Sequence, residues 1–282
     1  MDKLIQYPTR ASLYNGEFGG EAGWPAAGMG YVYVIDEARA VVVDGGHGED
    51  AEDLPALLRK ATGKDIPTVD LWIITHPHLD HYGAIRELAS REDLRGRVLI
   101  GEIMWYFPAE FRDRNGNAVC VKANGHMAEI REALGAAAHH PVEGERITVG
   151  GLELTVLFVP FHCGGLTNPN SLSLIFTVKS HRKTVMMTGD ACPVTMGYCV
   201  KRYGTTLKSD VLQLPHHGLC DTGNAEFYRL VGAKTLLIPI SEAGDRAMRS
   251  GMYGEATAVN SVADELAAEV YRAYEGYREI EL

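Results

Sequence analysis

The sequence predicts a protein of the α/β class. Three observations carry this prediction: a β-rich hairpin pattern near the start, an alternation of strands and helices after it, and a second β-rich half from about residue 146. With 46% hydrophobic and 23% charged residues, the 282-residue chain can bury a substantial core. Neither a repeat of fixed period nor a linker divides it. We therefore expect one domain over residues 1–282.

The first half of the chain alternates strands with helices. Residues up to about 30 are rich in glycine and predict a loop. Two short β-rich runs around a polar break then predict a hairpin. Apolar spacing predicts the elements that follow. The expected hairpin strands cover 30–36 and 40–46, followed by a helix over 51–61, a strand over 69–76, a helix over 80–90 and a strand over 97–103.

The second half begins with an irregular insertion at about 101–145, for which we predict a helix over 125–138. Aromatic residues in the insertion either pack in the core or form a lid, since loops on a rigid scaffold often carry specificity. These residues are Trp105, Tyr106, Phe107 and Phe111. Strands dominate after the insertion. We expect β-rich segments over 146–160, 171–178, 184–190 and 210–218, a helix over 225–232, a strand over 233–241, a helix over 259–270 and a closing segment over 277–282.

Composition excludes several classes of function. A net charge of -10 gives no basic surface for gripping extended nucleic acid, so a small-molecule substrate is the expected partner. No run approaches the roughly 18 apolar residues of a membrane span, and the first residues lack the layout of a secretory signal. Five cysteines without a CxxC pair suit reduced thiols. We expect a cytoplasmic protein, and the oligomeric state stays open.

The stretch "THPHLDHYG" at 75–83 carries the chemistry. His76 and His78 lie two apart across Pro77, so in an extended turn both side chains point to the same side. Asp80 and His81 follow where the chain enters a helix. This spacing can present two pairs of ligands to two neighbouring points, which suits two metal ions about 3.5–4 Å apart.

Two later strands end in groups that can also bind metal. "TVMMTGD" places Asp190 at its end, and "DVLQLPHHG" places His216 and His217 just beyond an apolar run. Acidic or imidazole side chains at three strand ends are hard to explain by packing alone. The sequence therefore predicts a metal centre at one edge of the sheets.

Taken together, these motifs resemble the metallo-β-lactamase superfamily. The resemblance rests on "HPHLDH", the earlier "VVVDGG", the later "TGD" and the final "PHHG", and it covers roughly residues 26–282. Within the superfamily the sequence is most similar to the hydrolase domain of bacterial DNA-uptake channel proteins of the competence system, which also has a run like "NSLSLIF". The resemblance implies a four-layer αββα sandwich with two mixed β-sheets and a site where the strands end.

The resemblance also implies a role for each site residue. His76 and His78 correspond to ligands of a first metal, and Asp80, His81 and His217 to ligands of a second. In addition, Asp190 corresponds to the carboxylate that bridges both metals, and Asp44 to an acidic residue beneath the site that orients ligands. His216, beside the expected ligand, could contact a phosphate oxygen or protonate a leaving group, unless the two adjacent histidines have exchanged roles.

One feature departs from the family pattern. Many members supply a third histidine to the first metal, and the only candidate here is His162 in "VPFHCGG", which is either a ligand or a structural histidine. Without it the first site is incomplete, or is filled by water or Asn170.

The ligand set predicts a metal-dependent hydrolase with a metal-bridging hydroxide. Two divalent cations are expected, zinc by default, with manganese or iron as alternatives. The family resemblance favours a phosphodiester substrate. A carboxylic ester, lactone, thioester or β-lactam is the first alternative, and a non-catalytic metal-binding sensor or binding module is the second. The proposed catalytic groups are Asp80 and His216.

Overall fold

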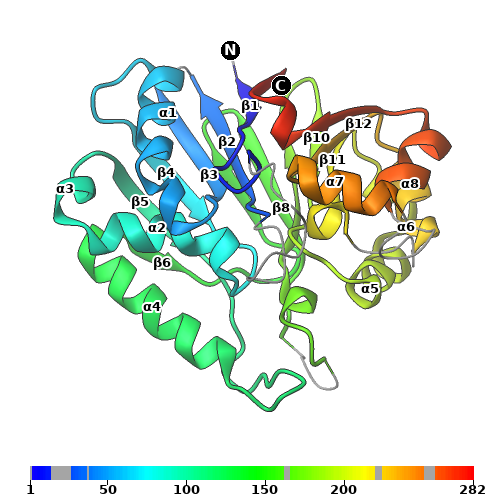
Figure 1. The fold of residues 1–282 in the computed structure, drawn as a ribbon, viewed down its shortest axis with the longest axis horizontal. Helices are drawn as coiled ribbons and strands as arrows, with labels where there is room; N and C mark the ends of the chain where they lie inside the picture. Colours follow the sequence, from blue (N-terminus) through cyan, green and yellow to red (C-terminus); the bar gives the residue numbers. More distant parts are fainter. Residues whose placement is uncertain (1, 14–26, 37, 162–165, 220–223, 251–257) are drawn as a thin grey trace.

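The computed structural model describes residues 2–13, 27–36, 38–161, 166–219, 224–250 and 258–282. Two mixed seven-stranded sheets pack face to face, and helices cover the outer side of each sheet (Figure 1). This arrangement confirms the predicted four-layer αββα sandwich. No described helix is both long and apolar enough to cross a membrane.

The first sheet is built mainly from the N-terminal half, and the chain's last strand returns to its edge beside β1. The predicted hairpin is confirmed, because β2 and β3 pair antiparallel. From β3 to β6 the strands are parallel, so their carboxyl ends lie at one edge. In sheet order the strands are β14 (Arg278–Glu281), β1 (Lys3–Gln6), β2 (Gly30–Ile35), β3 (Arg39–Asp44), β4 (Thr68–Ile73), β5 (Leu99–Met104) and β6 (Ala137–His139).

The second sheet comes entirely from the C-terminal half. Its strands β10 to β13 are parallel, while β7, β8, β9 and β10 pair antiparallel in succession. In sheet order the strands are β13 (Glu269–Arg272), β12 (Thr235–Ile238), β11 (Val211–Gln213), β10 (Thr184–Met187), β9 (Ile175–Lys179), β8 (Leu152–Phe158) and β7 (Arg146–Val149).

The helices divide between the two outer layers (Figure 1). Those beside the first sheet are α1 (Asp53–Thr62), α2 (Leu79–Ser90), α3 (Glu92–Arg95) and α4 (Val119–Leu134), and those beside the second are α5 (Pro193–Tyr203), α6 (Ala225–Val231), α7 (Glu242–Arg249) and α8 (Ala258–Leu266). Short 3-10 turns complete the described elements: η1 (Gly48–Ala51), η2 (Pro169–Leu172), η3 (Gly204–Leu207), η4 (Pro215–Gly218) and η5 (Ala273–Glu275).

Three apolar layers hold these elements together, and the period-two pattern of the strands explains them. Along β2, Val32 and Val34 face the helices, whereas Tyr31 and Tyr33 face the other sheet. A third apolar layer lies between the second sheet and its helices, and Met186 of β10 is buried in it. Because both faces of the central strands are buried, their sequences are apolar almost throughout, as expected for such strands.

The insertion is more regular than predicted. Its helix α4 begins at Val119, six residues before the expected start at 125, and β6 extends the first sheet. Trp105, Phe107 and Phe111 are buried under the helices of the first sheet, so the lid alternative is wrong for these three. Tyr106 is partly buried between the sheets. These aromatic side chains stabilise the fold by burying apolar area.

The sequence pattern missed β1, α5, α7 and β13. β1 and β13 have 4 residues each and α7 has 8, whereas α5 has 11; β1 lies within a glycine-rich region that predicted a loop. Segment 259–270, expected as one helix, divides into α8 and β13. The described cysteines Cys120, Cys192 and Cys199 are buried, while 163 and 220 lie outside the described residues.

Candidate metal centre

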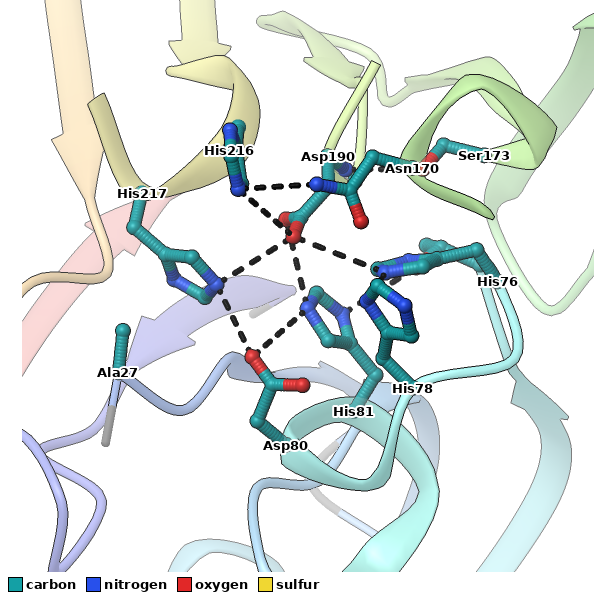
Figure 2. Close-up of polar contacts among 12 residues, drawn as sticks. Ala27, His76, His78, Asp80, His81, Asn170, Ser173, Asp190, His216 and His217 are labelled. Atoms are coloured by element: carbon teal, nitrogen blue, oxygen red, sulfur yellow. Dashed lines mark hydrogen bonds and ion pairs between the residues drawn. The ribbon is translucent and has the colours of Figure 1, made fainter. Parts of the chain in front are cut away.

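The candidate centre lies where parallel strands of both sheets end (Figure 2). Asp44 is the last residue of β3, and His76 follows β4 by three residues. On the second sheet, Asp190 follows β10 and His216 follows β11. Carboxyl ends of parallel strands commonly form ligand sites in α/β folds. The sheet topology therefore brings together groups that are up to 172 residues apart in sequence.

The candidate ligands form two sets that share one carboxylate. The first site comprises His76, His78 and Asp190, and the second site comprises Asp80, His81, Asp190 and His217. Within each set, one ligand atom per residue lies within 4.8 Å of every other. The shared member, Asp190, is only 2% exposed. It is therefore placed to bridge two cations.

The spacing within the sites fits metal coordination. In the second site, Nε2 of His217 lies 3.2 Å from Oδ2 of Asp80, and Nε2 of His81 lies 3.3 Å from Oδ1 of Asp190. In the first site, Nε2 of His76 lies 3.0 Å from Nδ1 of His78 and 3.6 Å from Oδ2 of Asp190. Two ligands bound about 2.0–2.1 Å from a tetrahedral ion lie roughly 3.3 Å apart. The donor atoms are thus near the separations that a shared ion requires.

Protein oxygens hold the two imidazoles of the second site in one orientation. Nδ1 of His81 lies 2.7 Å from Oδ2 of Asp44, and Nδ1 of His217 lies 2.8 Å from the carbonyl oxygen of Pro239. Each Nδ1–H donates outward, so each Nε2 turns toward the carboxylates. A carboxylate or carbonyl behind a ligating histidine fixes its tautomer and raises its basicity.

Asp44 itself is fixed by Thr75. The backbone N–H and the hydroxyl of Thr75 both donate to Asp44, each at 2.8 Å. The same hydroxyl oxygen lies 3.1 Å from Nδ1 of His76 and can accept its proton. One carboxylate therefore supports His81 directly and His76 through Thr75, as the resemblance implied for Asp44.

Several buried polar atoms at the centre have no hydrogen-bond partner among the described residues. They are Nε2 of His81, Nε2 of His217, Oδ1 of Asp190 and Oδ1 of Asn170. An unsatisfied buried polar atom costs about 1–3 kcal/mol, so four at one place need an explanation. Divalent cations bound by imidazole nitrogen and carboxylate oxygen would satisfy them, and the residues present fit such ions.

A family comparison agrees with this geometry. The family model described as "Metallo-beta-lactamase superfamily" matches residues 25–218, more than half of the chain. The chain belongs to the metallo-beta-lactamase superfamily. Among curated proteins, no sequence matches this chain.

Solved structures of the metallo-beta-lactamase fold resemble the whole chain. The metallo-beta-lactamase fold protein YhfI of Bacillus subtilis is 14% identical with a TM-score of 0.54, covering 99% of this chain and 100% of its own. Zn2+-bound PqqB of Methylobacterium extorquens is 10% identical with a TM-score of 0.57, covering 100% of both. The diiron beta-hydroxylase CmlA of Streptomyces venezuelae is 12% identical with a TM-score of 0.53, and this chain spans 54% of its length. At these identities the likeness concerns the fold alone.

Electrostatics distinguish the two sites of this metallo-beta-lactamase fold. Burial opposes the charge of His217, but Asp190 and Asp80 outweigh it and raise the pKa of His217 to about 10. Burial is likewise outweighed at His81, whose pKa lies well above 6.5 because of Asp190, Asp44 and Asp80. By contrast, burial and the neighbouring His81 lower the pKa of His76 well below 6.5. The second site therefore attracts a cation, whether a proton or a metal, more strongly than the first.

The carboxylates show the complementary effect. Burial would favour the neutral form of Asp190, yet the imidazoles of His217, His81 and His76 hold its pKa well below 3.8. Burial is similarly outweighed at Asp80, mainly by His81 and His217, so its pKa also lies well below 3.8. Both groups are ionised at neutral pH and can act as anionic ligands.

The backbone at the centre adopts conformations that few residues tolerate. Asp44, His216 and His217 have positive φ angles of 57°, 50° and 55°. Gly189 has φ 53°, and a Cβ there would lie 2.9 Å from Cβ of Thr75, so "TGD" needs its glycine. Left-handed non-glycine residues cost about 1–3 kcal/mol each and cluster at functional sites. Here the strained residues are the ligand His217, its neighbour His216 and the supporting Asp44.

His216 and Asn170 lie at the edge of the first site. Nε2 of His216 is 2.9 Å from Nδ2 of Asn170 and 4.0 Å from Oδ2 of Asp190. Burial lowers the pKa of His216 below 6.5, which favours a neutral ring. Of the two adjacent histidines, His217 lies within the second site, as the resemblance implied. His162 lies outside the described residues.

Three contributors to the centre were not found from the sequence. They are Thr75, which supports Asp44; Ser173, whose Oγ accepts the backbone N–H of Asp190 at 2.9 Å; and the carbonyl of Pro239. Thr75 directly precedes the histidine motif, which could have drawn attention to it. Ser173 and Pro239 each make one hydrogen bond that exists only in the folded chain, and no sequence pattern predicts either bond.

Proposed function

We propose that this protein is a binuclear metal-dependent hydrolase that acts on a small phosphodiester. The observation that carries the proposal is the pair of ligand sets joined by the buried carboxylate of Asp190. When bound, two divalent cations, zinc by default with manganese or iron as alternatives, would activate a water and polarise the attacked centre. As proposed ligands, His76, His78 and Asp190 would hold one cation, and Asp80, His81, His217 and Asp190 the other.

The protein's own groups supply orientation and charge. Asp44 and the Pro239 carbonyl keep the Nε2 atoms of His81 and His217 directed inward. Of the carboxylates, Asp80 is the more exposed, at 23% for its side chain against 2% for Asp190. Asp80 is therefore the carboxylate that a substrate can reach, and with His216 it is a proposed catalytic group. Asn170 is proposed to support the site from the side of His216.

A cavity along α2 offers arginine side chains to an anionic substrate, although the proposed metal ligands do not line it. It has a volume of about 650 Å³ and runs along α2 from Leu79, the residue before Asp80. Arg10, Arg86 and Arg91 are among its lining residues. The first and last of these pair with carboxylates, whereas Arg86 has no ion-pair partner among the described residues. An unpaired guanidinium is suited to binding a phosphate oxygen.

The charge of -10 and the resemblance to the competence-system hydrolase domain narrow the substrate further. The resemblance supports a phosphodiester. The overall acidity argues against extended nucleic acid, whose binding depends on many basic contacts. A small phosphodiester in the cytoplasm satisfies both considerations.

The test is a substrate comparison on protein supplied with Zn2+ or Mn2+. We expect the highest kcat/KM for bis(p-nitrophenyl) phosphate, compared with p-nitrophenyl acetate, a γ-lactone and nitrocefin. Asp80→Ala should lower phosphodiester hydrolysis about a hundredfold or more, because it removes a ligand. Faster turnover of an acyl substrate would favour the ester, lactone, thioester or β-lactam alternative. Bound metal without any turnover would favour a non-catalytic sensor or binding module.

A further inference from the structure

Among the described residues, the first site has one candidate ligand fewer than the second. His76, His78 and Asp190 supply three donor atoms, whereas the second site has four. Zinc in proteins takes four ligands, of which a catalytic site can leave one to water. A protein atom that completes the first site must be buried, polar and without another partner.

Asn170 provides such an atom. Its side chain is 6% exposed, and its Oδ1 is buried without a hydrogen-bond partner. Figure 2 shows the amide with its nitrogen turned toward His216 and its oxygen turned away from that ring, on the side where His76 lies. An amide oxygen left unpaired in this position is placed to face a cation in the first site.

His216 fixes the orientation of the amide. Nδ2 of Asn170 donates to Nε2 of His216 at 2.9 Å. Turning the amide over would break this bond unless the ring also changed its tautomer. The backbone N–H of Asn170 donates to Oδ1 of Asn168 at 3.1 Å, which holds η2 in place. His216 thereby acts as a positioning residue for the oxygen of Asn170.

We propose that Oδ1 of Asn170 is the fourth protein ligand of the first site, and that the first site is the weaker of two unequal metal positions. This inference rests on the proposed binuclear centre. The second site has the carboxylate of Asp80 to itself and shares Asp190, while the first has only its share of Asp190. An amide oxygen is neutral and hard, so the first site favours Mn2+ relative to Zn2+ more than the second site does.

The experiment titrates metal-free protein with Zn2+ and, separately, Mn2+, measuring stoichiometry and affinity by calorimetry and by competition with a chelator. Wild type should bind two ions with distinct affinities. Asn170→Ala should weaken the lower-affinity ion about tenfold or more and leave the tighter ion unchanged. Asn170→Asp, which keeps the shape and adds a negative charge, should tighten the lower-affinity ion.

Asn115→Ala is the matched control, because it truncates an exposed asparagine in the insertion that is not among the candidate ligands. It should bind both ions as wild type does. His162→Ala should also keep the weaker site, because the proposal needs no ligand from that residue. If Asn170→Ala does not fold, Asn170→Asp carries the test alone.

Several results would overturn the proposal. Unchanged affinities in Asn170→Ala, equal losses in Asn115→Ala, loss of the weaker ion in Asn170→Asp, or its loss only in His162→Ala would each remove Asn170 as a ligand. All four would leave the metal-dependent hydrolase standing, provided wild type binds two ions. Wild type that binds no metal would instead refute the proposed function itself.

Discussion

The two candidate metal positions share Asp190 but differ in how their other ligands are held. In the second site, both imidazoles donate Nδ1–H to a protein oxygen, from Asp44 and Pro239. In the first site, His76 is held by Thr75, while the only side-chain hydrogen bond seen for His78 among the described residues is the one to His76. The second site therefore has two supported imidazoles and two carboxylates, whereas the first has one supported imidazole and only the shared carboxylate.

This difference shows how a fold can build two unlike sites from one motif. His78 precedes α2 and His81 lies in its first turn, so the two residues are neighbours in sequence. Only His81 reaches the carboxylate at the end of β3. Orientation by supporting oxygens changes metal affinity by roughly 10- to 100-fold. This difference in hydrogen-bond support is large enough for the second site to bind its metal ion before the first site does.

The largest expected effect comes from removing what the sites share. Asp190→Asn keeps the shape of the side chain but removes its charge, so both positions lose their bridging anion. We expect metal content to fall from about two ions to less than one, and hydrolysis to fall roughly a thousandfold or more. Plasma mass spectrometry and initial rates measure the two quantities. Asp210→Asn, in the loop before β11, should change neither, and retention of two ions in Asp190→Asn would contradict a bridging role.

A pH titration sharpens the contrast between the sites. The pKa of His217 is raised to about 10 and that of His81 is also raised, so metal-free protein holds protons at the second site at neutral pH. The pKa of His76 is lowered, and its ring needs no deprotonation. Affinity for the tighter ion should therefore rise with pH from 6 toward 10, up to about a hundredfold per unit for two protons. Affinity for the weaker ion should change little.

Calorimetry in buffers of different ionisation enthalpy counts the protons released by each ion at pH 7.5. The tighter ion should release about two and the weaker about none. For the metal-free protein, the sign for stability is the opposite of that for affinity. Charged His217 stabilises the fold fully below its unfolded pKa of about 6.5, and this contribution is lost as pH rises through about 10. If binding of each ion displaced the same number of protons, the proposed difference in histidine pKa between the two sites would be wrong.

A smaller effect on metal affinity is expected from replacing Asp44, which accepts the hydrogen bond from Nδ1 of His81. Asp44→Asn leaves both sets of metal ligands intact but replaces the charged acceptor of His81 Nδ1–H. The tighter ion should bind about tenfold more weakly, with the weaker ion nearly unaffected. Metal titration measures both, and thermal unfolding of the metal-free variant checks the fold. Equal weakening of both ions would mean that Thr75 transmits the change to His76.

The smallest effect concerns the arginine of the cavity along α2. Arg86 lines the cavity along α2 and has no ion-pair partner among the described residues. Arg86→Ala should raise KM for bis(p-nitrophenyl) phosphate about fivefold at unchanged kcat and metal content, the scale of one exposed ion pair. Arg59→Ala on α1 is the matched control. An unchanged KM would place the substrate elsewhere around the centre.

The sequence by itself determined the fold class and most of the candidate ligands. Period-two and period-3.6 patterns identified the hairpin, β4, α2 and the strands that end at the centre, because strands buried on both faces are apolar throughout. The dense motif around His76 and His81 needed no tertiary information. The same is true of Asp190, since its "TGD" follows an apolar strand.

Tertiary structure alone decided which groups meet and how they are held. The contacts from Ser173 to Asp190 and from Pro239 to His217 each join segments whose proximity depends on sheet order. The burial of Trp105 and its neighbours was likewise invisible in a stretch without periodicity. The unpaired oxygen of Asn170 follows from a single hydrogen bond to His216. Local sequence specifies elements and residue types, but hydrogen-bond partners across the fold depend on packing between distant segments.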